Sequence, residues 1–490
     1  MKNCVISAVG RNSLHREWMK GAYCEFDLHL IVYDDSLERY ARDADFIYAI
    51  KGYKLKVVHE YLTLHPEVLE KYDYFFIPDD DIRMDALTIN NLFFAMRSFH
   101  LQIAQPALVD SYYLWGHTLG DPYCRLRYTN YVEMMVPCFS RDALRQVLFT
   151  FNENTTGWGT ETHWPLLIGA GVRDMAILDS IEVVHTRPIQ SGQRLHWMEA
   201  AAYLVKYGLE TQVHEYGYLP SKNAGLYLCE RSAFRRMVET VGRTLHTPMN
   251  FKEVGMCGWY GYAYMLSLYG LLTQSRKHKD RALQVLAHVQ GGLHCIKDDL
   301  TFSHGIIGCG WLIEFLSRNG LLRENSSEIL EELDAYVDAY VDKHLCEMSP
   351  VELVGIGNYW LAKVENGNGE LRLDRCKTVA ARLKVLDLPS CLDDAHLLDA
   401  ILLLGACGED VQGWTSILKN RMTEPGKNVV SQLSVSYALY RLMGDANCYA
   451  RSRMLVSQMD FGKLSLWDSC EVLRLIYEDM KFIDESKKWK

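Results

Sequence analysis

Apolar residues in the first 200 positions gather in short runs of the kind that form buried strands. Such runs lie at 4–10, 27–35, 72–81, 101–108, 131–140 and 180–186. Between them, residues 37–70 and 83–99 repeat their apolar positions with helical spacing. Because strands alternate with helices, the pattern predicts an α/β sheet, mostly parallel, with helices on both faces.

The pattern changes near residue 250, where strand-like runs end and helical periodicity takes over. Apolar segments that contain glycine recur about every 45 residues, at 258–272, 303–316, 353–364 and 393–408. This period is typical of helical-hairpin repeats, although glycines that only let helices pack closely would give the same pattern. We therefore predict an α/β domain over 1–205, a linker over 206–250 and an all-α domain over 251–490.

Composition and charge narrow the class of protein. The chain has 490 residues and a formal net charge of -10, which excludes a general nucleic-acid binder because no basic excess exists to neutralise phosphates. The apolar run at 4–10 is too short for a signal peptide, and no stretch is apolar enough to span a membrane. The 14 cysteines are scattered without a C-x-x-C pair. We expect reduced thiols, a cytoplasmic location and no transmembrane segment.

The strongest candidate for chemistry is the sequence YDYFFIPDDDI, in which an apolar strand runs directly into three aspartates. Residues two apart point to the same side of an extended segment, so Asp79 and Asp81 can converge on one ion while Asp80 faces away. In α/β sheets ligands bind at the carboxyl ends of strands. Two carboxylates suit Mg²⁺ or Mn²⁺. A solvated acidic loop is the alternative interpretation.

Two later segments, the GWGTE loop and the strand that ends at His185, supply further candidate site residues. In the GWGTE loop at 157–161, Gly157 permits a tight turn, Trp158 offers a flat face for a sugar ring, and Glu161 can accept a proton from a hydroxyl. A glycine loop with a core tryptophan is the alternative. His185 ends an apolar strand and is either an ordinary loop histidine or a third metal ligand.

The order of these elements resembles metal-dependent glycosyltransferases of the GT-A fold. More closely, residues 1–190 resemble the family labelled domain of unknown function 707. The similar stretches are PDDDI at 78–82, QPAL at 105–108, and residues 127–144, 157–164 and 176–189.

The resemblance implies a transferase that uses a nucleotide-sugar donor and Mn²⁺ or Mg²⁺. It implies that Asp79 and Asp81 hold the metal and the donor diphosphate, and that His185 completes the metal shell. Trp158 and Gly157 would bind the acceptor. Glu161 would be the catalytic base, and a single base implies inversion at the sugar carbon.

Nucleotide contacts are predicted from residues that follow the first strands. The candidates are Arg11, Asp34, Lys51, Lys56 and Asp80, with Lys54 in the same basic cluster. An ordinary solvated face is an equally good interpretation of the lysines.

In the second half, residues 300–322 resemble the lanthionine-synthetase-C-like family, which has an α/α-toroid fold and a zinc ion held by two cysteines and a histidine. This chain lacks the W-C-x-G and C-H-G motifs, and Cys391 and His396 are five residues apart and do not share a helical face. We therefore expect a non-catalytic or altered toroid, with binding of the acceptor as one role for it. His304, Asp298 and Asp299 are a minor candidate for a second active site.

The leading prediction is a two-domain glycosyltransferase that moves a sugar from a nucleotide-sugar donor to a glycan, lipid-linked or peptide acceptor. One alternative is a peptide-binding or peptide-modifying protein with a nucleotide-binding N-terminal domain. Another is a bifunctional transferase and glycosidase. The sequence leaves open the sugar, the base of the nucleotide, the acceptor and the oligomeric state.

Overall fold

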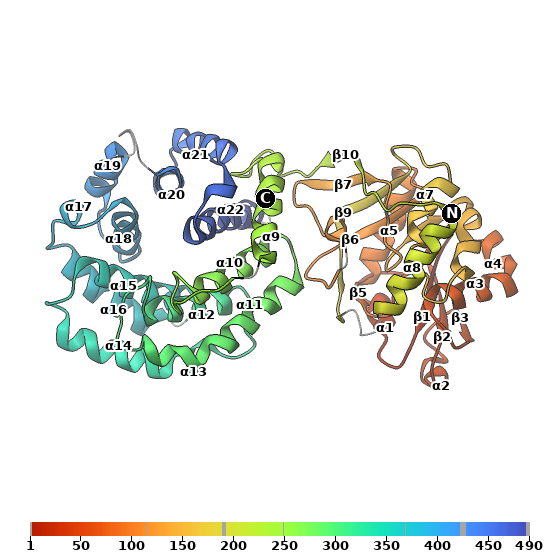
Figure 1. The fold of residues 1–490 in the computed structure, drawn as a ribbon, viewed down its shortest axis with the longest axis horizontal. Coiled ribbons are helices and arrows are strands. Elements are labelled where there is room, and N and C mark those ends of the chain that lie inside the picture. The colour runs from red at the N-terminus through yellow and green to blue at the C-terminus, as the bar shows by residue number, and fades with distance from the viewer. Residues whose placement is uncertain are drawn as a thin grey trace. The chain divides into compact units, whose positions relative to one another are not determined.

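The computed structural model describes residues 2–113, 115–188, 193–247, 249–367, 369–421 and 428–486. The chain forms two compact units (Figure 1). Unit 1 comprises Met1–Ala224 and Thr273–Arg276, and unit 2 comprises Gly225–Leu272 and Lys277–Lys490. The predicted linker at 206–250 contains a strand of unit 1, β10 (Glu215–Pro220), and a helix of unit 2, α9 (Arg231–His246). Within the described residues, no helix combines the length and apolarity that crossing a membrane requires.

Unit 1 is built on one ten-stranded sheet with the order β10-β7-β9-β6-β8-β4-β1-β2-β3, and β5 pairs with β9. The other strands are β1 (Asn3–Val9), β2 (Asp27–Val32), β3 (Phe46–Ala49), β4 (Tyr74–Phe76), β5 (Ile82–Arg83), β6 (Ile103–Leu108), β7 (Cys124–Thr129), β8 (Cys138–Ser140) and β9 (Met175–His185).

The sheet is mixed, so the prediction of a mostly parallel sheet is wrong. Parallel pairs join β3, β2, β1 and β4, and also β6 and β9. All other pairs are antiparallel, including both pairs of β8, which lies between β4 and β6. Parallel neighbours need a long crossover, usually a helix. The described residues between β6 and β8 hold no α-helix that could form such a crossover. The two strands accordingly pair antiparallel.

The predicted apolar runs locate some strands of the sheet well and others poorly. β2, β4 and β6 lie inside predicted apolar runs, and β1 begins one residue before its run, at Asn3; every residue of β1 is buried. Residues 131–140 form a strand only at 138–140. β3 lies inside the segment predicted as helix, and β10 alternates half-buried and exposed residues. These edge strands bury too few side chains to leave a strong apolar pattern.

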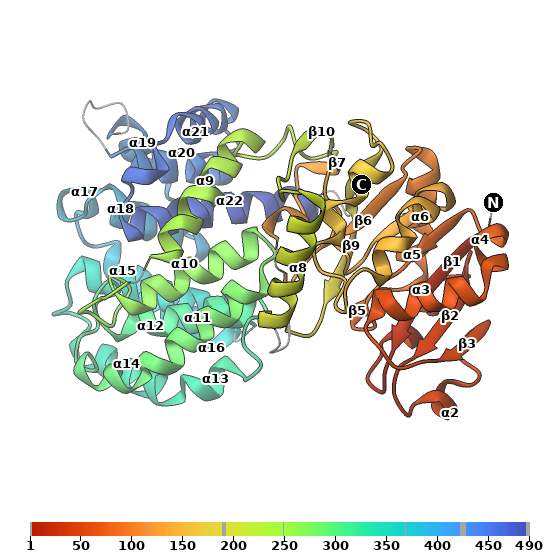
Figure 2. The ribbon, with the colours of Figure 1, turned by 45° about the vertical axis from the view of Figure 1, so that its right-hand side comes forward.

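Helices cover both faces of this sheet, as predicted (Figure 2). One apolar core contains residues of α5 (Ala86–Ser98), and the other contains residues of α3 (Lys54–Leu64) and α6 (Arg141–Val147). The strand β1 contributes Val5 and Val9 to the first core and Cys4 and Ile6 to the second, as alternation along a strand requires. The remaining helices of unit 1 are α1 (His15–Trp18), α2 (Leu37–Tyr40), η1 (Gly116–Thr118), α4 (Pro66–Lys71), η2 (Leu148–Asn152), η3 (Thr160–Thr162), α7 (Trp164–Leu167) and α8 (Gln193–Tyr207).

Unit 2 contains only helices among its described residues, which agrees with the predicted all-α domain. Its helices after α9 are α10 (Trp259–Leu272), α11 (Arg276–Val289), η4 (Gln290–Cys295), α12 (Ile306–Arg318), α13 (Ser326–Ile329), α14 (Glu331–His344), α15 (Pro350–Glu365), α16 (Gly369–Leu383), α17 (Leu388–Cys391), α18 (Asp394–Ala406), α19 (Gln412–Arg421), α20 (Val429–Met443), α21 (Ala446–Gln458), η5 (Phe461–Lys463) and α22 (Leu466–Ser486).

The four glycine-containing segments of unit 2 form α10, α12, α15 and α18. Contacts connect these helices in series, continue through α20 to α22, and return from α22 to α10. Close packing explains at least one glycine, because a Cβ at Gly357 in α15 would lie 2.2 Å from Cδ2 of Leu403 in α18. Close helix packing therefore accounts for Gly357, whereas a Cβ at Gly405 in α18 would have no atom within 4 Å.

Candidate metal and substrate site

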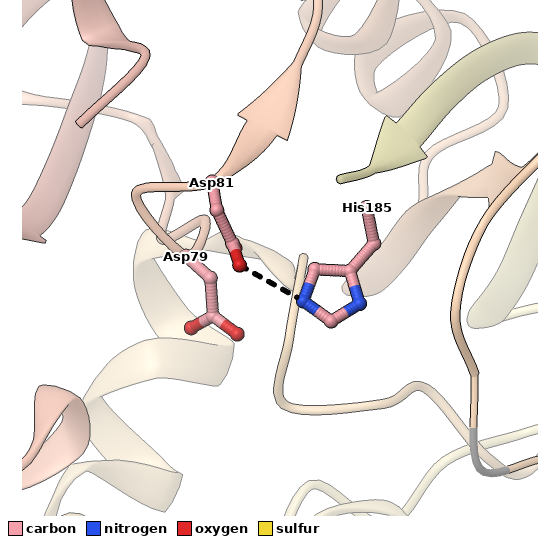
Figure 3. Close-up of side chains that lie close together, drawn as sticks. All are labelled: Asp79, Asp81 and His185. Carbon is pink, nitrogen blue, oxygen red and sulfur yellow. Dashed lines mark ion pairs between the residues drawn. The ribbon is translucent and has the colours of Figure 1, made fainter. Parts of the chain in front are cut away.

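The candidate site forms where the segment after β4 meets the end of β9. The backbone N–H of Asp79 donates to the carbonyl of Met135 at 2.9 Å, which continues the pairing beyond the end of β4. β5 then pairs antiparallel with β9, with Ile82 opposite His185. This register brings Asp81, the residue before β5, to His185, and the two side chains form an ion pair of 3.1 Å (Figure 3).

Asp79, Asp81 and His185 can share one metal ion. Their potential ligand atoms all lie within 4.8 Å of one another, and Figure 3 shows the three side chains gathered around one space. The Nδ1 of His185 lies 2.9 Å from the carbonyl of Tyr112, and this contact leaves Nε2 facing the aspartates. Metal-bound histidines are usually oriented by such a contact through their other nitrogen. Two carboxylates and one imidazole fit Mn²⁺ or Mg²⁺.

Two cations also contact the aspartates. Lys54, at the start of α3, has its Nζ 2.5 Å from Oδ1 of Asp79. Arg187, two residues beyond His185, bridges the other two acids, with Nη2 2.6 Å from Asp80 and Nε 3.1 Å from Asp81. Both cations lie close enough to the aspartates to contact a diphosphate bound there as well.

Asp80 does not face away, in contrast to the sequence expectation. It is buried, and its Oδ2 accepts hydrogen bonds from the backbone N–H of Gly10 at 2.8 Å and from the hydroxyl of Tyr33 at 3.2 Å. The strand ends at Phe76 and the chain turns at residues 80 and 81, so the alternation of an extended segment no longer applies there.

The buried pair of Asp81 and His185 shifts the protonation of both groups. Burial alone would raise the pKa of the Asp81 carboxyl, but the hydrogen bond and charge of His185, together with the charge of Arg187, lower it below its ordinary value. Burial would lower the pKa of His185, yet the hydrogen bond and charge of Asp81 raise it. Asp81 is therefore ionised at neutral pH and available as a metal ligand.

These residues line a cavity of about 540 Å³ in unit 1. Six of the predicted site residues line it: Asp79, Asp80, Asp81, Trp158, Glu161 and His185. The five predicted residues outside its wall are Arg11, Asp34, Lys51, Lys56 and Gly157. A volume of this size is in the usual range for small-molecule sites.

The residues outside the wall have other contacts or are exposed. Arg11 pairs through its side chain with Asp35 at 2.7 Å, and its backbone N–H donates to Asp34 at 2.7 Å. Lys51 and Lys56 are exposed, whereas Lys54 of the same basic cluster lines the cavity. The helix α3 begins at Lys54, and its turn directs Lys54 and Lys56 to different sides.

Several residues of the site escaped the sequence analysis. Arg187 had a detectable signal, because it is a cation two residues after the candidate ligand His185, at the end of an apolar run. Glu133 gave none, since it lies inside a run that reads as a strand. His196 and Trp197 of α8 also line the cavity and are far in sequence from every motif.

Glu161 is buried at 8% exposure in the cavity wall. Its Oε1 accepts a hydrogen bond of 2.8 Å from the hydroxyl of Tyr131. Burial raises the pKa of this carboxyl, although hydrogen bonds from Tyr131 and from the backbone oppose the shift. A raised pKa brings a carboxyl closer to the range in which it can take up a proton at neutral pH.

Gly159 in the same loop supports α8 at close range. Its φ is 90°, and a Cβ there would lie 3.1 Å from Cα and 3.2 Å from O of Ala200. We expect Gly159→Ala to lower the free energy of unfolding of unit 1 by about 2–4 kcal/mol, from left-handed strain plus overpacking against α8. Gly169→Ala is the matched control, because Gly169 also has positive φ (57°) but no atom within 4 Å of its Cβ position. It should cost only about 1–2 kcal/mol. Equal losses in urea unfolding would contradict the close approach.

In unit 2, the candidate residues for zinc or a second active site stay apart. Cys391 is exposed, and Nδ1 of His396 lies 2.8 Å from Asp393. Nδ1 of His304 lies 2.9 Å from Glu253. Across the residues that the structure describes, none of these side chains belongs to a group that could hold a metal ion, and Asp79, Asp81 and His185 are the group that does.

Comparison with known proteins supports the family resemblance over part of unit 1. The family described as "Protein of unknown function (DUF707)" matches residues 24–120. This range contains Asp79, Asp80 and Asp81 but stops before the GWGTE loop and His185. The remainder of the resemblance proposed for residues 1–190 lies outside it. No curated protein sequence matches this chain.

Solved structures give only distant similarities. S. aureus TarS is 10% identical with a TM-score of 0.27, covering 38% of this chain and 37% of TarS. The chain thus spans about 37% of the length of that structure. S. aureus TarS 1–349 in complex with UDP-GlcNAc is 10% identical with a TM-score of 0.28, covering 88% of this chain and 95% of that one.

Mannose-1-phosphate geranyltransferase from Thermus thermophilus is 12% identical with a TM-score of 0.20, covering 38% of this chain and 74% of that one. TM-scores at this level establish no common fold. The functional argument therefore depends on the geometry of the site.

Proposed function

We propose that unit 1 is a divalent-metal-dependent glycosyltransferase that moves a sugar from a nucleotide-sugar donor to a hydroxyl acceptor. The observation that carries this proposal is the convergence of Asp79, Asp81 and His185 in one cavity with the buried carboxyl of Glu161. A metal-ligand group and a proton acceptor in one cavity are what transfer to a hydroxyl requires.

The metal side of the cavity fits a nucleoside diphosphate. Asp79, Asp81 and His185 would hold Mn²⁺ or Mg²⁺, which as a Lewis acid stabilises negative charge on a departing diphosphate. Lys54 and Arg187 line the same wall and would contact phosphate oxygens. In this role Lys54 replaces Lys51 and Lys56, which lie outside the wall.

Arg11 and Asp34 lie outside the cavity wall. They would contact the part of the nucleotide that extends beyond the cavity. Asp80 would act on the nucleotide indirectly, because its carboxylate holds Arg187 and the N–H of Gly10. The support for Arg11 and Asp34 is their position, because they follow the carboxyl ends of β1 and β2, where ligands of α/β sheets bind.

On the acceptor side, Glu161 would take the proton from the attacking hydroxyl. Tyr131 holds one carboxylate oxygen at 2.8 Å and fixes the orientation of the group. We propose inversion at the sugar carbon, because Glu161 acts as base and no covalent sugar intermediate is needed.

For unit 2 we propose an α/α-toroid that is not itself catalytic. The series of contacts from α10 through α12, α15, α18, α20 and α22 back to α10 supports a closed ring of helices. The absence of a zinc group among its described residues argues against cyclase chemistry of the lanthionine-synthetase type.

The test is a thermal-shift screen of the full chain with nucleoside diphosphates and nucleotide sugars, each with and without Mn²⁺. Ligand at about 100 times its Kd stabilises the folded state by about 2.7 kcal/mol, so the matching nucleotide should raise Tm by several degrees. We expect the shift to require both Mn²⁺ and the nucleotide and to disappear with EDTA. If no nucleotide in the panel shifts Tm with Mn²⁺, the proposed function is wrong.

A further inference from the structure

One wall of the cavity in unit 1 is aromatic and comes from two segments that are distant in sequence. Trp158 belongs to the GWGTE loop, and His196 and Trp197 belong to α8. The rings of Trp158 and His196 stack with centroids 4.7 Å apart and planes 18° apart. The ring of Trp197 stands at 87° to Trp158, with centroids 5.3 Å apart. Together the rings offer two flat apolar surfaces that meet at a corner.

This aromatic wall is held in place before any ligand binds. The carboxylate of Glu199 in α8 accepts hydrogen bonds from the backbone N–H groups of Thr156 at 2.8 Å and Thr155 at 3.3 Å. These contacts tie α8 to the residues just before Trp158. Gly159 permits the close approach of Ala200 on the other side of Trp158. A wall ordered in advance loses little conformational entropy on binding.

Two buried carboxyls line the same cavity and have unused hydrogen-bonding capacity. Glu133 is 4% exposed and Glu161 is 8% exposed. Among the residues that the structure describes, Oε2 of each has no hydrogen-bond partner. A buried polar atom that lacks a partner costs free energy, so a ligand whose hydroxyls form hydrogen bonds with both carboxyls is favoured.

We propose that these residues form an acceptor subsite for a carbohydrate. A sugar ring lies through its C–H face on Trp197, with Trp158 beside it, and its hydroxyls form hydrogen bonds with Glu133 and Glu161. The inference rests on the proposed glycosyltransferase function, because Asp79 and Asp81 line the same cavity. It adds Glu133, His196 and Trp197 to the site and selects a glycan among the possible acceptors.

The chemistry of the wall disfavours two other ligands. The alkyl chain of an anionic lipid beside Glu133 and Glu161 would leave both buried carboxyls without a hydrogen-bond partner. A small organic cation would meet complementary charge and aromatic rings. It needs a close cage, however, whereas Trp197 is 47% exposed and the cavity measures about 540 Å³. A sugar ring uses both an aromatic face and the carboxyls.

The experiment measures binding to the full chain by titration calorimetry, without metal or nucleotide. The probes are the tetrasaccharides of glucose, N-acetylglucosamine, mannose and galactose, with farnesyl phosphate and tetramethylammonium as the lipid and cation probes. We expect at least one tetrasaccharide to bind. Trp197→Ala should weaken it about tenfold through the lost stacking surface. Glu133→Gln should also weaken it about tenfold, because an amide NH₂ takes the place of a carboxyl oxygen that meets a sugar hydroxyl.

Controls separate a lost contact from a lost fold. Trp467→Ala removes a comparably exposed tryptophan (38%) of α22, outside the cavity, and should leave saccharide affinity unchanged. Trp197→Phe keeps an aromatic face and should retain most of the affinity, even if Trp197→Ala is poorly folded. Thermal melting of each variant checks that the fold persists.

The inference is overturned if no tetrasaccharide binds at millimolar concentration, whether or not farnesyl phosphate or tetramethylammonium binds. It is also overturned if the Trp197 and Glu133 variants bind as tightly as the unaltered chain. The proposed function fails separately. If Mn²⁺ with nucleotides gives no thermal shift but saccharides bind through Trp197 and Glu133, the carbohydrate site stands without it. If the shift is present and no saccharide binds, only this inference is wrong.

Discussion

Asp81→Asn is expected to abolish the Mn²⁺-dependent thermal shift with nucleotides and to lower donor turnover about 1000-fold. Asp81 is central because its Oδ2 contacts both His185 and Arg187 at 3.1 Å. Asparagine keeps the shape but removes the negative charge that attracts a divalent ion. A metal Lewis acid contributes several kcal/mol, and a loss of about 4 kcal/mol is about 1000-fold in rate.

The control for this variant is Asp142→Asn, which removes the same charge from an exposed position in the first turn of α6. It should leave the Mn²⁺-dependent shift intact. The quantity to compare is the shift between samples with and without Mn²⁺, because loss of the Asp81 ion pairs also changes Tm directly. A full shift in Asp81→Asn would show that the metal is not held where Asp79, Asp81 and His185 meet.

The second large effect is on stability. Lys363→Met is expected to lower the free energy of unfolding of unit 2 by about 3–5 kcal/mol, the usual cost of breaking a buried ion pair from one side. Nζ of Lys363 lies 2.8 Å from Glu314 and 2.9 Å from Asp334. The side chains of Lys363 and Glu314 are 2% and 0% exposed. Without the lysine, Glu314 is a buried charge that keeps hydrogen bonds from Ser326 and Asn366 but no cation among its described contacts.

Urea unfolding of the full chain measures this loss, and the Gly159→Ala variant identifies which transition belongs to unit 1. Lys384→Met is the matched control, since Lys384 pairs with Glu409 at 2.6 Å on the surface, with 45% and 32% exposure. It should change stability by about 1 kcal/mol or less. Adding Glu314→Gln to Lys363→Met should recover part of the loss. A loss no larger than that of the control would mean that the buried pair contributes little.

The metal-binding part of the site is the part that local sequence could predict. A short apolar run followed by acids predicts that these acids lie at the carboxyl end of a strand. An apolar run that ends in histidine predicts the same position for that histidine. The structure brings Asp79, Asp81 and His185 together from these two places. Both signals are local, because they depend on a few consecutive side chains and on the alternation of a strand.

The rest of the cavity could not be predicted in this way. Glu133 lies in a segment whose apolar pattern indicates a strand, but only its last three residues, Cys138–Ser140, form one. His196 and Trp197 reach the cavity because Ala200 packs on Gly159 and Glu199 binds the backbone just before the GWGTE loop. Such contacts join residues about 40 positions apart and leave no periodic trace.

The sequence by itself determined that β1, β2, β4 and β6 are strands, that the second half is helical, and which three side chains are suited to a divalent ion. These properties follow from burial and backbone alternation within short stretches. Only the tertiary structure decided that the sheet is mixed, that Asp80 turns inward to Arg187, and that α8 supplies an aromatic wall. Those outcomes depend on which strands pair and how closely a helix approaches a glycine, and the energies involved come from residues distant in the chain.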